Sequence, residues 1–169
     1  MPQIAVAEES PTTYKVSFKT DTNEIISPNL KSNIQAYNVN LAASGRTTDI
    51  PLGQLILTAE YAATNAIRLS IRSKNTSVAV LADIRRTTIY AGGVIEVQTF
   101  DNTKITTRLV LDDTVYAQSD ETHWMRIRQQ DPTTSLWSMC EVLTFSSAGS
   151  ARTSICVNWL YTGASFQAP

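Results

Sequence analysis

The sequence predicts an all-β fold, an antiparallel β-sandwich of about ten strands. From Leu55 to Tyr161, short β-type runs alternate with turn-forming residues, and many of these runs repeat apolar residues with a period of two. Thr, Ser, Asn and Gln make up much of the remaining composition, which is typical of sheet surfaces and large interfaces. These observations favour a sandwich or a barrel.

The first 28 residues are expected to form an extended lead-in with one strand. Three prolines punctuate this segment, and apolar and polar residues alternate from Tyr14 to Lys19. A second strand is predicted from Ile34 to Leu41. The segment from Ala43 to Gly53 is predicted to be a loop, because it contains Pro51 and two glycines.

Residues 29–169 are expected to form the sandwich head, within a chain whose length suits a single domain. Leu, Ala and Glu in Gln54 to Ala66 leave a helix open as an alternative there, although strand is favoured. Asp101 to Thr103 resembles a tight hairpin turn. The remaining strands are predicted at Leu55–Tyr61, Ile67–Ile71, Val78–Ile84, Thr87–Tyr90, Val94–Phe100, Ile105–Leu111, Met125–Gln129, Trp137–Phe145 and Thr153–Tyr161.

Composition argues against nucleic acid as a partner and against membrane insertion. Charged residues are only 17% of the chain, and 14 basic against 15 acidic residues give a formal net charge of -1. Met1 to Thr13 contains Glu8 and Glu9 but no Lys or Arg, which disfavours a coat protein that packages a genome through a basic arm. No stretch has the length of a membrane helix or the pattern of a signal peptide, so a mature, soluble chain is expected.

Two cysteines, Cys140 and Cys156, lie in neighbouring predicted strands, so a disulfide between them is geometrically possible. Reduced thiols in the core are the favoured alternative, because free cysteine is among the most commonly buried residues. A nucleophilic pair with the single histidine, His123, is disfavoured because both cysteines lie in apolar runs.

An acidic cluster surrounds Val115 and Tyr116, and oxygen-rich loops of this kind can hold calcium. The ordered ligand spacing of a calcium-binding loop is missing, so a solvated loop is the favoured interpretation. The cluster consists of Asp112, Asp113, Asp120, Glu121 and His123. No cofactor, no metal and no enzymatic activity are expected.

Trp124 is the strongest candidate for a semi-exposed binding residue, because it lies between His123 and Arg126 at a predicted strand entry. Aromatic rings often stack on sugar faces, although most large aromatic residues of a β protein belong to its core. Asn75 and Asp131 join these three as receptor or glycan candidates from their positions in predicted loops.

The last two predicted strands carry a resemblance to a known class of proteins. WSMCEVLTF at Trp137–Phe145, a Gly-Ser loop, and TSICVNWLY at Thr153–Tyr161 resemble the closing strands of trimeric phage tail-fibre and tail-needle knobs. These heads have a jelly-roll or tumour-necrosis-factor-like fold. The resemblance covers Leu55 to Tyr161 by strand pattern and includes no diagnostic motif.

The resemblance implies a homotrimer at the exposed surface or tail of a virion, which contacts other virion proteins and a host glycan or protein. Receptor-binding loops would be Ser73–Ser77, Ser119–His123, Gln130–Ser135 and Ser146–Arg152. A capsid decoration protein, with an N-terminal arm that is ordered only against its neighbours, is the nearest alternative. A carbohydrate-binding lectin module unrelated to viruses remains a third.

Overall fold

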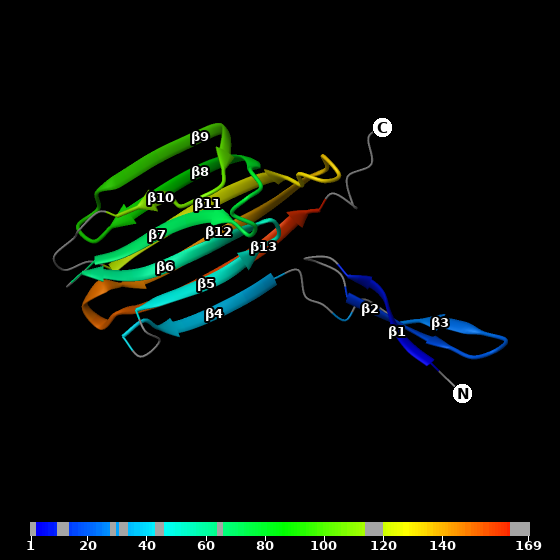
Figure 1. The fold of residues 1–169 in the computed structure, drawn as a ribbon. Coiled ribbons are helices and arrows are strands. Elements are labelled where there is room, and N and C mark those ends of the chain that lie inside the picture. The colour runs from blue at the N-terminus through cyan, green and yellow to red at the C-terminus, as the bar shows by residue number, and fades with distance from the viewer. Residues whose placement is uncertain are drawn as a thin grey trace.

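The computed structural model describes residues 3–9, 14–27, 30, 34–42, 46–63, 66–113 and 120–162. Within these residues the chain is almost entirely β, with one short 3₁₀ helix at Ala148–Ser150 (Figure 1). The strands are β1 (Gln3–Glu9), β2 (Tyr14–Lys19), β3 (Glu24–Ile26), β4 (Ile34–Asn40), β5 (Thr47–Leu52), β6 (Leu55–Ala63), β7 (Ala66–Ser73), β8 (Val80–Tyr90), β9 (Ile95–Ile105), β10 (Leu109–Asp112), β11 (Asp120–Gln130), β12 (Trp137–Ser147) and β13 (Arg152–Tyr161).

Two antiparallel sheets form the predicted sandwich. One has the order β10-β7-β6-β5 and the other the order β4-β13-β12-β11-β8-β9, and most neighbours in these orders are consecutive along the chain. Figure 1 shows the sheets as two layers that face each other. The all-β antiparallel sandwich is thus confirmed, whereas this strand order does not establish a jelly-roll connection.

The core lies between the two sheets because each strand turns every second side chain inward. Along β8 and β11 buried residues alternate with half-buried or exposed ones without interruption. Burying one Leu, Ile, Val or Met side chain contributes about 1.5–3 kcal/mol. The largest contributors include Leu55, Leu57, Leu69, Ile71, Ile84, Met125, Ile127, Val142 and Val157.

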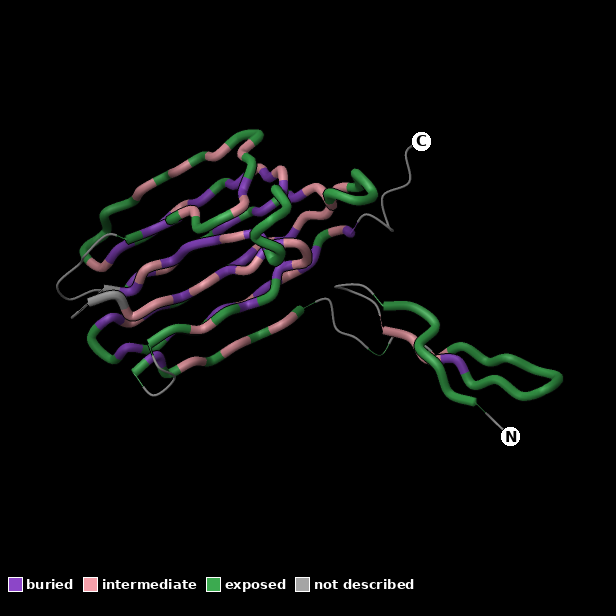
Figure 2. Tube along the Cα trace, in the orientation of Figure 1, coloured by how far each residue is buried: buried purple, intermediate pink, exposed green. Residues whose placement is uncertain are grey.

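The N-terminal lead-in contains three strands where the sequence predicted one. Strands β1, β2 and β3 form a separate antiparallel sheet, which we call the arm (Gln3–Ile26). Figure 2 shows that nearly all of the arm is exposed, and Figure 1 shows that it lies beyond the end of the sandwich.

Two further expectations are corrected by the structure. Residues 47–52 of the predicted loop form β5, whose place at the edge of its sheet tolerates Pro51. The two short strands expected between Val78 and Tyr90 are one strand, β8. The strand that was favoured over a helix within Gln54–Ala66 is confirmed as β6.

Asp101 to Thr103 is not a hairpin turn but part of β9. The register with β8 shifts at Asp83, because Ala82 pairs with Thr103 whereas Ile84 pairs with Phe100. Asn102 adopts a positive φ of 47° in this bulge, and its backbone N–H donates to Asp83 Oδ1 at 2.8 Å. The turn-forming residues therefore mark a β-bulge.

Both cysteines are free, in adjacent strands but on opposite faces. Cys140 pairs with Trp159 and is buried in the core, whereas Cys156 pairs with Leu143 and is half-buried on the outside of the sheet. Side chains on opposite faces of a sheet point apart, so this register rules out the disulfide that the sequence left open.

No helix within the described residues is long and apolar enough to cross a membrane.

Candidate functional site

Two features of the sandwich stand out from an ordinary β core. The first is a group of buried polar side chains between the two sheets, with Asp112 from β10 and the others from the six-stranded sheet, which we call the polar cluster. The second is an exposed apolar surface on the outer face of the same sheet. The polar cluster consists of Arg86, Thr88, Tyr90, Asp112, Glu121, His123 and Thr144.

Asp112 is the centre of the polar cluster. Its Oδ2 accepts a hydrogen bond from Arg86 Nη1, and Thr88 Oγ1 and His123 Nε2 lie 3.3 and 3.0 Å away. The side chains of Arg86 and Asp112 are each only 1% exposed. A buried carboxylate is tolerated only when it is paired in this way, so the donors around Asp112 are required for its burial.

Tyr90 and Glu96 link this centre to solvent. The hydroxyl of Tyr90 lies 2.9 Å from Asp112 Oδ2 and 2.8 Å from Glu96 Oε2, and its single proton can be donated to only one of them at a time. Glu96, whose side chain is 45% exposed, also accepts from Arg86 Nη2 at 2.9 Å. Arg86 is thereby held between one buried and one exposed carboxylate.

The histidine is held by contacts at both ring nitrogens. Nε2 lies between Asp112 and Glu121, at 3.0 and 3.5 Å from their carboxylate oxygens, and must carry the proton that it donates there. In the neutral imidazole Nδ1 then accepts from the Thr144 hydroxyl, 2.8 Å away. His123 is fully buried and is fixed as a structural element of the interior.

The polar cluster contains the ligand types of a metal site but does not fit one. Asp112, Glu121 and His123 have ligand atoms within 4.8 Å of one another. The guanidinium of Arg86, however, already donates to the Asp112 oxygen that a cation would need. Its positive charge fills the role of the ion, so these residues suit a structural hydrogen-bonded cluster better than a metal centre.

The sequence placed these acidic residues in a solvated loop, and the structure corrects this for three of them. Asp112, Glu121 and His123 are buried, whereas Asp113 and Asp120 are exposed. Residues 120–123 of the predicted loop Ser119–His123 belong to β11, and Ser119 lies outside the described residues.

The outer face of the six-stranded sheet carries a row of aligned side chains that crosses all six strands. Trp124 pairs with Leu143 on one side and with Thr87 on the other. The row continues from Leu143 through Cys156 to Ala36 and from Thr87 to Val97. Paired residues share one face of a sheet, so these side chains form a continuous stripe.

A second row beside the first adds Phe145, Ile89 and Ile95 through the register of the same strands. Six large apolar side chains of the two rows are between 48 and 70% exposed. We call this surface the apolar band; it comprises Ala36, Ile89, Ile95, Val97, Trp124, Leu143, Phe145 and Cys156.

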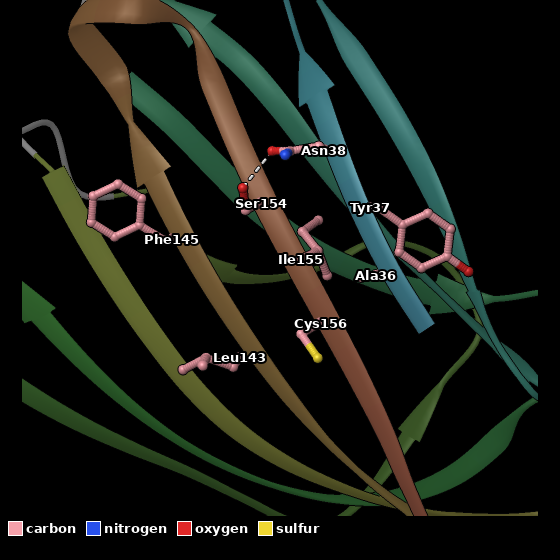
Figure 3. Close-up of a pocket in the computed structure, with 8 residues that line it drawn as sticks. All are labelled: Ala36, Tyr37, Asn38, Leu143, Phe145, Ser154, Ile155 and Cys156. Atoms are coloured by element: carbon pink, nitrogen blue, oxygen red, sulfur yellow. Dashed lines mark hydrogen bonds between the residues drawn. The ribbon is translucent and has the colours of Figure 1, made fainter. Parts of the chain in front are cut away.

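The apolar band is hollowed at one side. Leu143, Phe145 and Cys156 line a depression of about 380 Å³ together with residues of β4 (Figure 3). At its rim Ser154 Oγ donates to Asn38 Oδ1 at 2.5 Å. The surface therefore offers shape as well as apolar area to whatever covers it.

The opposite outer face, on the four-stranded sheet, is adapted to water. Arg72 pairs with Asp49 at 2.8 Å, and Glu60 accepts from Arg108 and lies 3.6 Å from Arg68. The outer face of the six-stranded sheet also carries ion pairs beside the apolar band, among them Arg126–Glu141 and Arg128–Asp83, so the two outer faces differ in the apolar band and not in the presence of charge.

The structure separates the five predicted site residues. Trp124 and Arg126 lie on the outer face, with the Arg126 guanidinium 5.8 Å from the Trp124 ring centroid, but in the middle of β11 rather than at its entry. His123 precedes Trp124 in β11 and points to the interior, so its burial excludes the surface contact that the sequence assigned to it.

Asn75 and Asp131 lie in loops at one end of the sandwich, and Gln54 connects these loops. Its backbone carbonyl accepts from the Lys74 N–H at 2.8 Å, and its amide donates to Asp131 Oδ2 at 2.5 Å. Burial raises the pKa of Asp131, but hydrogen bonds from Thr134, Thr133 and Gln54 outweigh it and hold the pKa below the ordinary value of 3.8. Residues 74–77 and 132–135 of these two predicted loops are exposed, whereas Ser73 is buried at the end of β7 and Gln130 belongs to β11.

Residues 146–152 are only partly a surface loop. Ser146, Ala148 and Ala151 are buried, and the 3₁₀ helix Ala148–Ser150 occupies the middle of the segment.

Sequence reasoning missed the apolar band. Its signal was present, because β12 is apolar on both faces around Val142 and Leu143, a pattern that is typical of a strand covered on both sides.

Comparisons of the chain with protein-family models, with curated proteins and with solved structures found no match.

Proposed function

We propose that this chain is a non-enzymatic structural protein that works as a homo-oligomer, most simply as the trimeric receptor-binding head of a virion tail fibre or needle. The observation that carries the proposal is the apolar band. An exposed apolar band that is flanked by ion pairs on its own sheet, on a sandwich whose other outer face is charged, suits a subunit that packs against copies of itself.

Burial of the apolar band supplies the energy for this association. About 25 cal/mol is gained for each Å² of apolar surface that is removed from water. Trp124, Leu143 and Phe145 are each about half exposed and adjacent, so they can form the central cluster of an interface. Three copies related by a threefold axis close such contacts into a ring without leaving an open end.

The polar loops at the end of the sandwich would then face the host. The segments 74–79 and 131–136 are largely exposed, and Gln54 holds them close to each other. Asn75 and Asp131 offer amide and carboxylate groups of the kind that bind sugar hydroxyls or a protein surface. Contact with a host glycan or protein is assigned to this end.

A capsid decoration protein is the second candidate, and the arm favours it. A small sheet that stands apart from the head suits attachment to neighbouring subunits of a shell. Both candidates place the chain on a virion. In the trimeric head the chain is held by copies of itself, whereas in the decoration protein it is held by neighbouring subunits of the shell.

Light scattering of the full chain tests the proposal. A particle of three times 18.6 kDa is expected, and Leu143→Asp should dissociate it because the new charge would be buried in the interface. Val110→Asp, on the polar outer face of the other sheet, is the matched control and should leave the trimer intact. A monomer at all concentrations would contradict the trimeric head and favour the decoration protein.

A further inference from the structure

The arm is a sheet without a core. Ser17 is the one buried residue among the described strands β1, β2 and β3. The arm spans 24 residues from Gln3 to Ile26, and chains shorter than about 40 residues rarely bury enough apolar surface to be stable alone. Some other surface must therefore stabilise it.

One face of the arm is apolar by register. Ile4 pairs with Phe18, Val6 with Val16, and Phe18 with Ile25, so these five side chains lie on the same face. Ile4 is 70% exposed and Ile25 is 68% exposed. The opposite face bears Ala5 and Ser17, which also pair with each other.

The arm does not cover the apolar band of its own chain. It precedes β4, the strand at the edge of the six-stranded sheet, and Figures 1 and 2 show it extending beyond the sandwich. Each copy therefore presents two exposed apolar sheet faces, one on the arm and one on the head.

We infer that the apolar face of the arm packs on the apolar band of a neighbouring copy, as one sheet on another. This inference rests on the proposed function and names the contact that joins its subunits. Face-to-face sheets pack about 10 Å apart with interdigitated side chains. The depression lined by Leu143, Phe145 and Cys156 would receive side chains of the arm.

The size of the arm favours a closed ring over a single contact. Strands of seven, six and three residues cover roughly 260 Å² of sheet, so one contact buries roughly 500 Å² when both surfaces are counted. One such contact is smaller than the 1,200–2,000 Å² of a standard interface, whereas the three contacts of a closed ring together bury roughly 1,600 Å².

Cys156 provides a natural probe, because it lies in the apolar band. Wild-type chain, which carries Cys156, is mixed with a double variant that carries Ile4→Cys and Cys156→Ser. The mixture is dissociated and reassembled, and a short bismaleimide is then added to link thiols that lie close together. Burial raises the pKa of the Cys140 thiol to about 12, so this second cysteine stays protonated and unreactive. The control chain, Ala5→Cys/Cys156→Ser, places the thiol on the opposite face of the arm.

The expected product is a covalent heterodimer in which the peptide that contains position 4 is joined to the peptide that contains Cys156. Its yield should be at least fivefold higher than the yield of the corresponding heterodimer with the Ala5→Cys/Cys156→Ser control. A link between two arms, or equal yields for positions 4 and 5, would overturn the inference. A link within one chain, tested with Ile4→Cys alone at high dilution, would also overturn it. An oligomer by light scattering without the expected link refutes the inference alone, whereas a monomer refutes the proposed function as well.

Discussion

At the scale of single residues, the polar cluster shows how charged groups can replace part of a hydrophobic core. Asp112 pairs with Arg86 and His123 in a space where apolar side chains would otherwise meet, while the buried Arg86 Nε has no hydrogen-bond partner among the described residues. Breaking a buried ion pair by removing one partner costs about 3–5 kcal/mol, because the other charge stays buried. The stability of the sandwich should therefore depend strongly on this small group.

Asp112→Ala should lower the free energy of unfolding by about 3–5 kcal/mol, because it leaves Arg86 without its buried partner. Urea denaturation measures the change. Glu141→Ala is the control, since it removes an exposed partner of Arg126 and should cost only about 0.2–1 kcal/mol. Similar losses in the two variants would show that the polar cluster contributes little.

The sequence singled out Asp112, Glu121 and His123 of this cluster but not their burial, and it did not indicate the other members. Glu121 and His123 alternate with exposed residues of β11 just as Met125 and Ile127 do, yet their polarity hides the period of two. The predicted strand therefore began at Met125, five residues late. Polar residues on an inner face cannot be distinguished from a loop until their partners are known.

Asp131 carries a pH-dependent contribution to stability. Its lowered pKa means that its stabilising effect is present above its ordinary pKa of 3.8 and is lost as the pH falls through its value in the folded protein. Asp131→Ala should lower the unfolding free energy by about 0.5–1.5 kcal/mol at pH 7, and by less near pH 3. Thermal unfolding at both pH values, with exposed Asp113→Ala as control, measures this; a loss independent of pH would contradict it.

At the scale of elements, the turn between β5 and β6 is fixed by a side chain from the opposite sheet. Gln129 of β11 accepts from the Gln54 N–H and donates to the Leu52 carbonyl, each at 2.8 Å. Gly53 lies between them with a φ of 62°. The turn thus connects the two layers of the sandwich at the end that bears the polar loops.

Gly53→Ala should destabilise the sandwich more than Gly92→Ala. Both glycines have positive φ, which costs an L-residue about 1–2 kcal/mol, but a Cβ at Gly53 would lie 3.1 Å from Gln129 Oε1 and 3.2 Å from Trp159. Nothing lies within 4 Å of a Cβ at Gly92. Chemical denaturation should show an extra loss of about 1–3 kcal/mol for Gly53→Ala, as for overpacking; equal losses would mean that the close approach relaxes freely.

Strands with regular alternation were predicted well, and those with interruptions were not. β12 and β13 match their predicted ranges within two residues, because apolar residues recur in both. β5 was missed because Pro51 signals a loop, although an edge strand accepts it. β8 was divided because Arg86 points inward at a position where an apolar residue was expected.

At the scale of the whole molecule, the chain combines a well-packed sandwich with two apolar surfaces that it leaves exposed. The sequence predicted the class of fold from its period of two, but that pattern does not distinguish an inner face from an outer face that a partner covers. The sequence alone therefore does not assign Leu143 and Phe145 to either face. Only the arrangement of the sheets shows that they face outward.

The bulge at Asp101 and Asn102 limits how copies of the chain can meet. An edge strand with regular pairing groups is a template onto which further strands can add without limit, which leads to fibrous aggregates. In β9, an edge of the six-stranded sheet, the shifted register, Asn102 with positive φ and the charge of Lys104 interrupt this template. A concentrated solution of the protein should therefore stop at discrete particles instead of growing into fibrils.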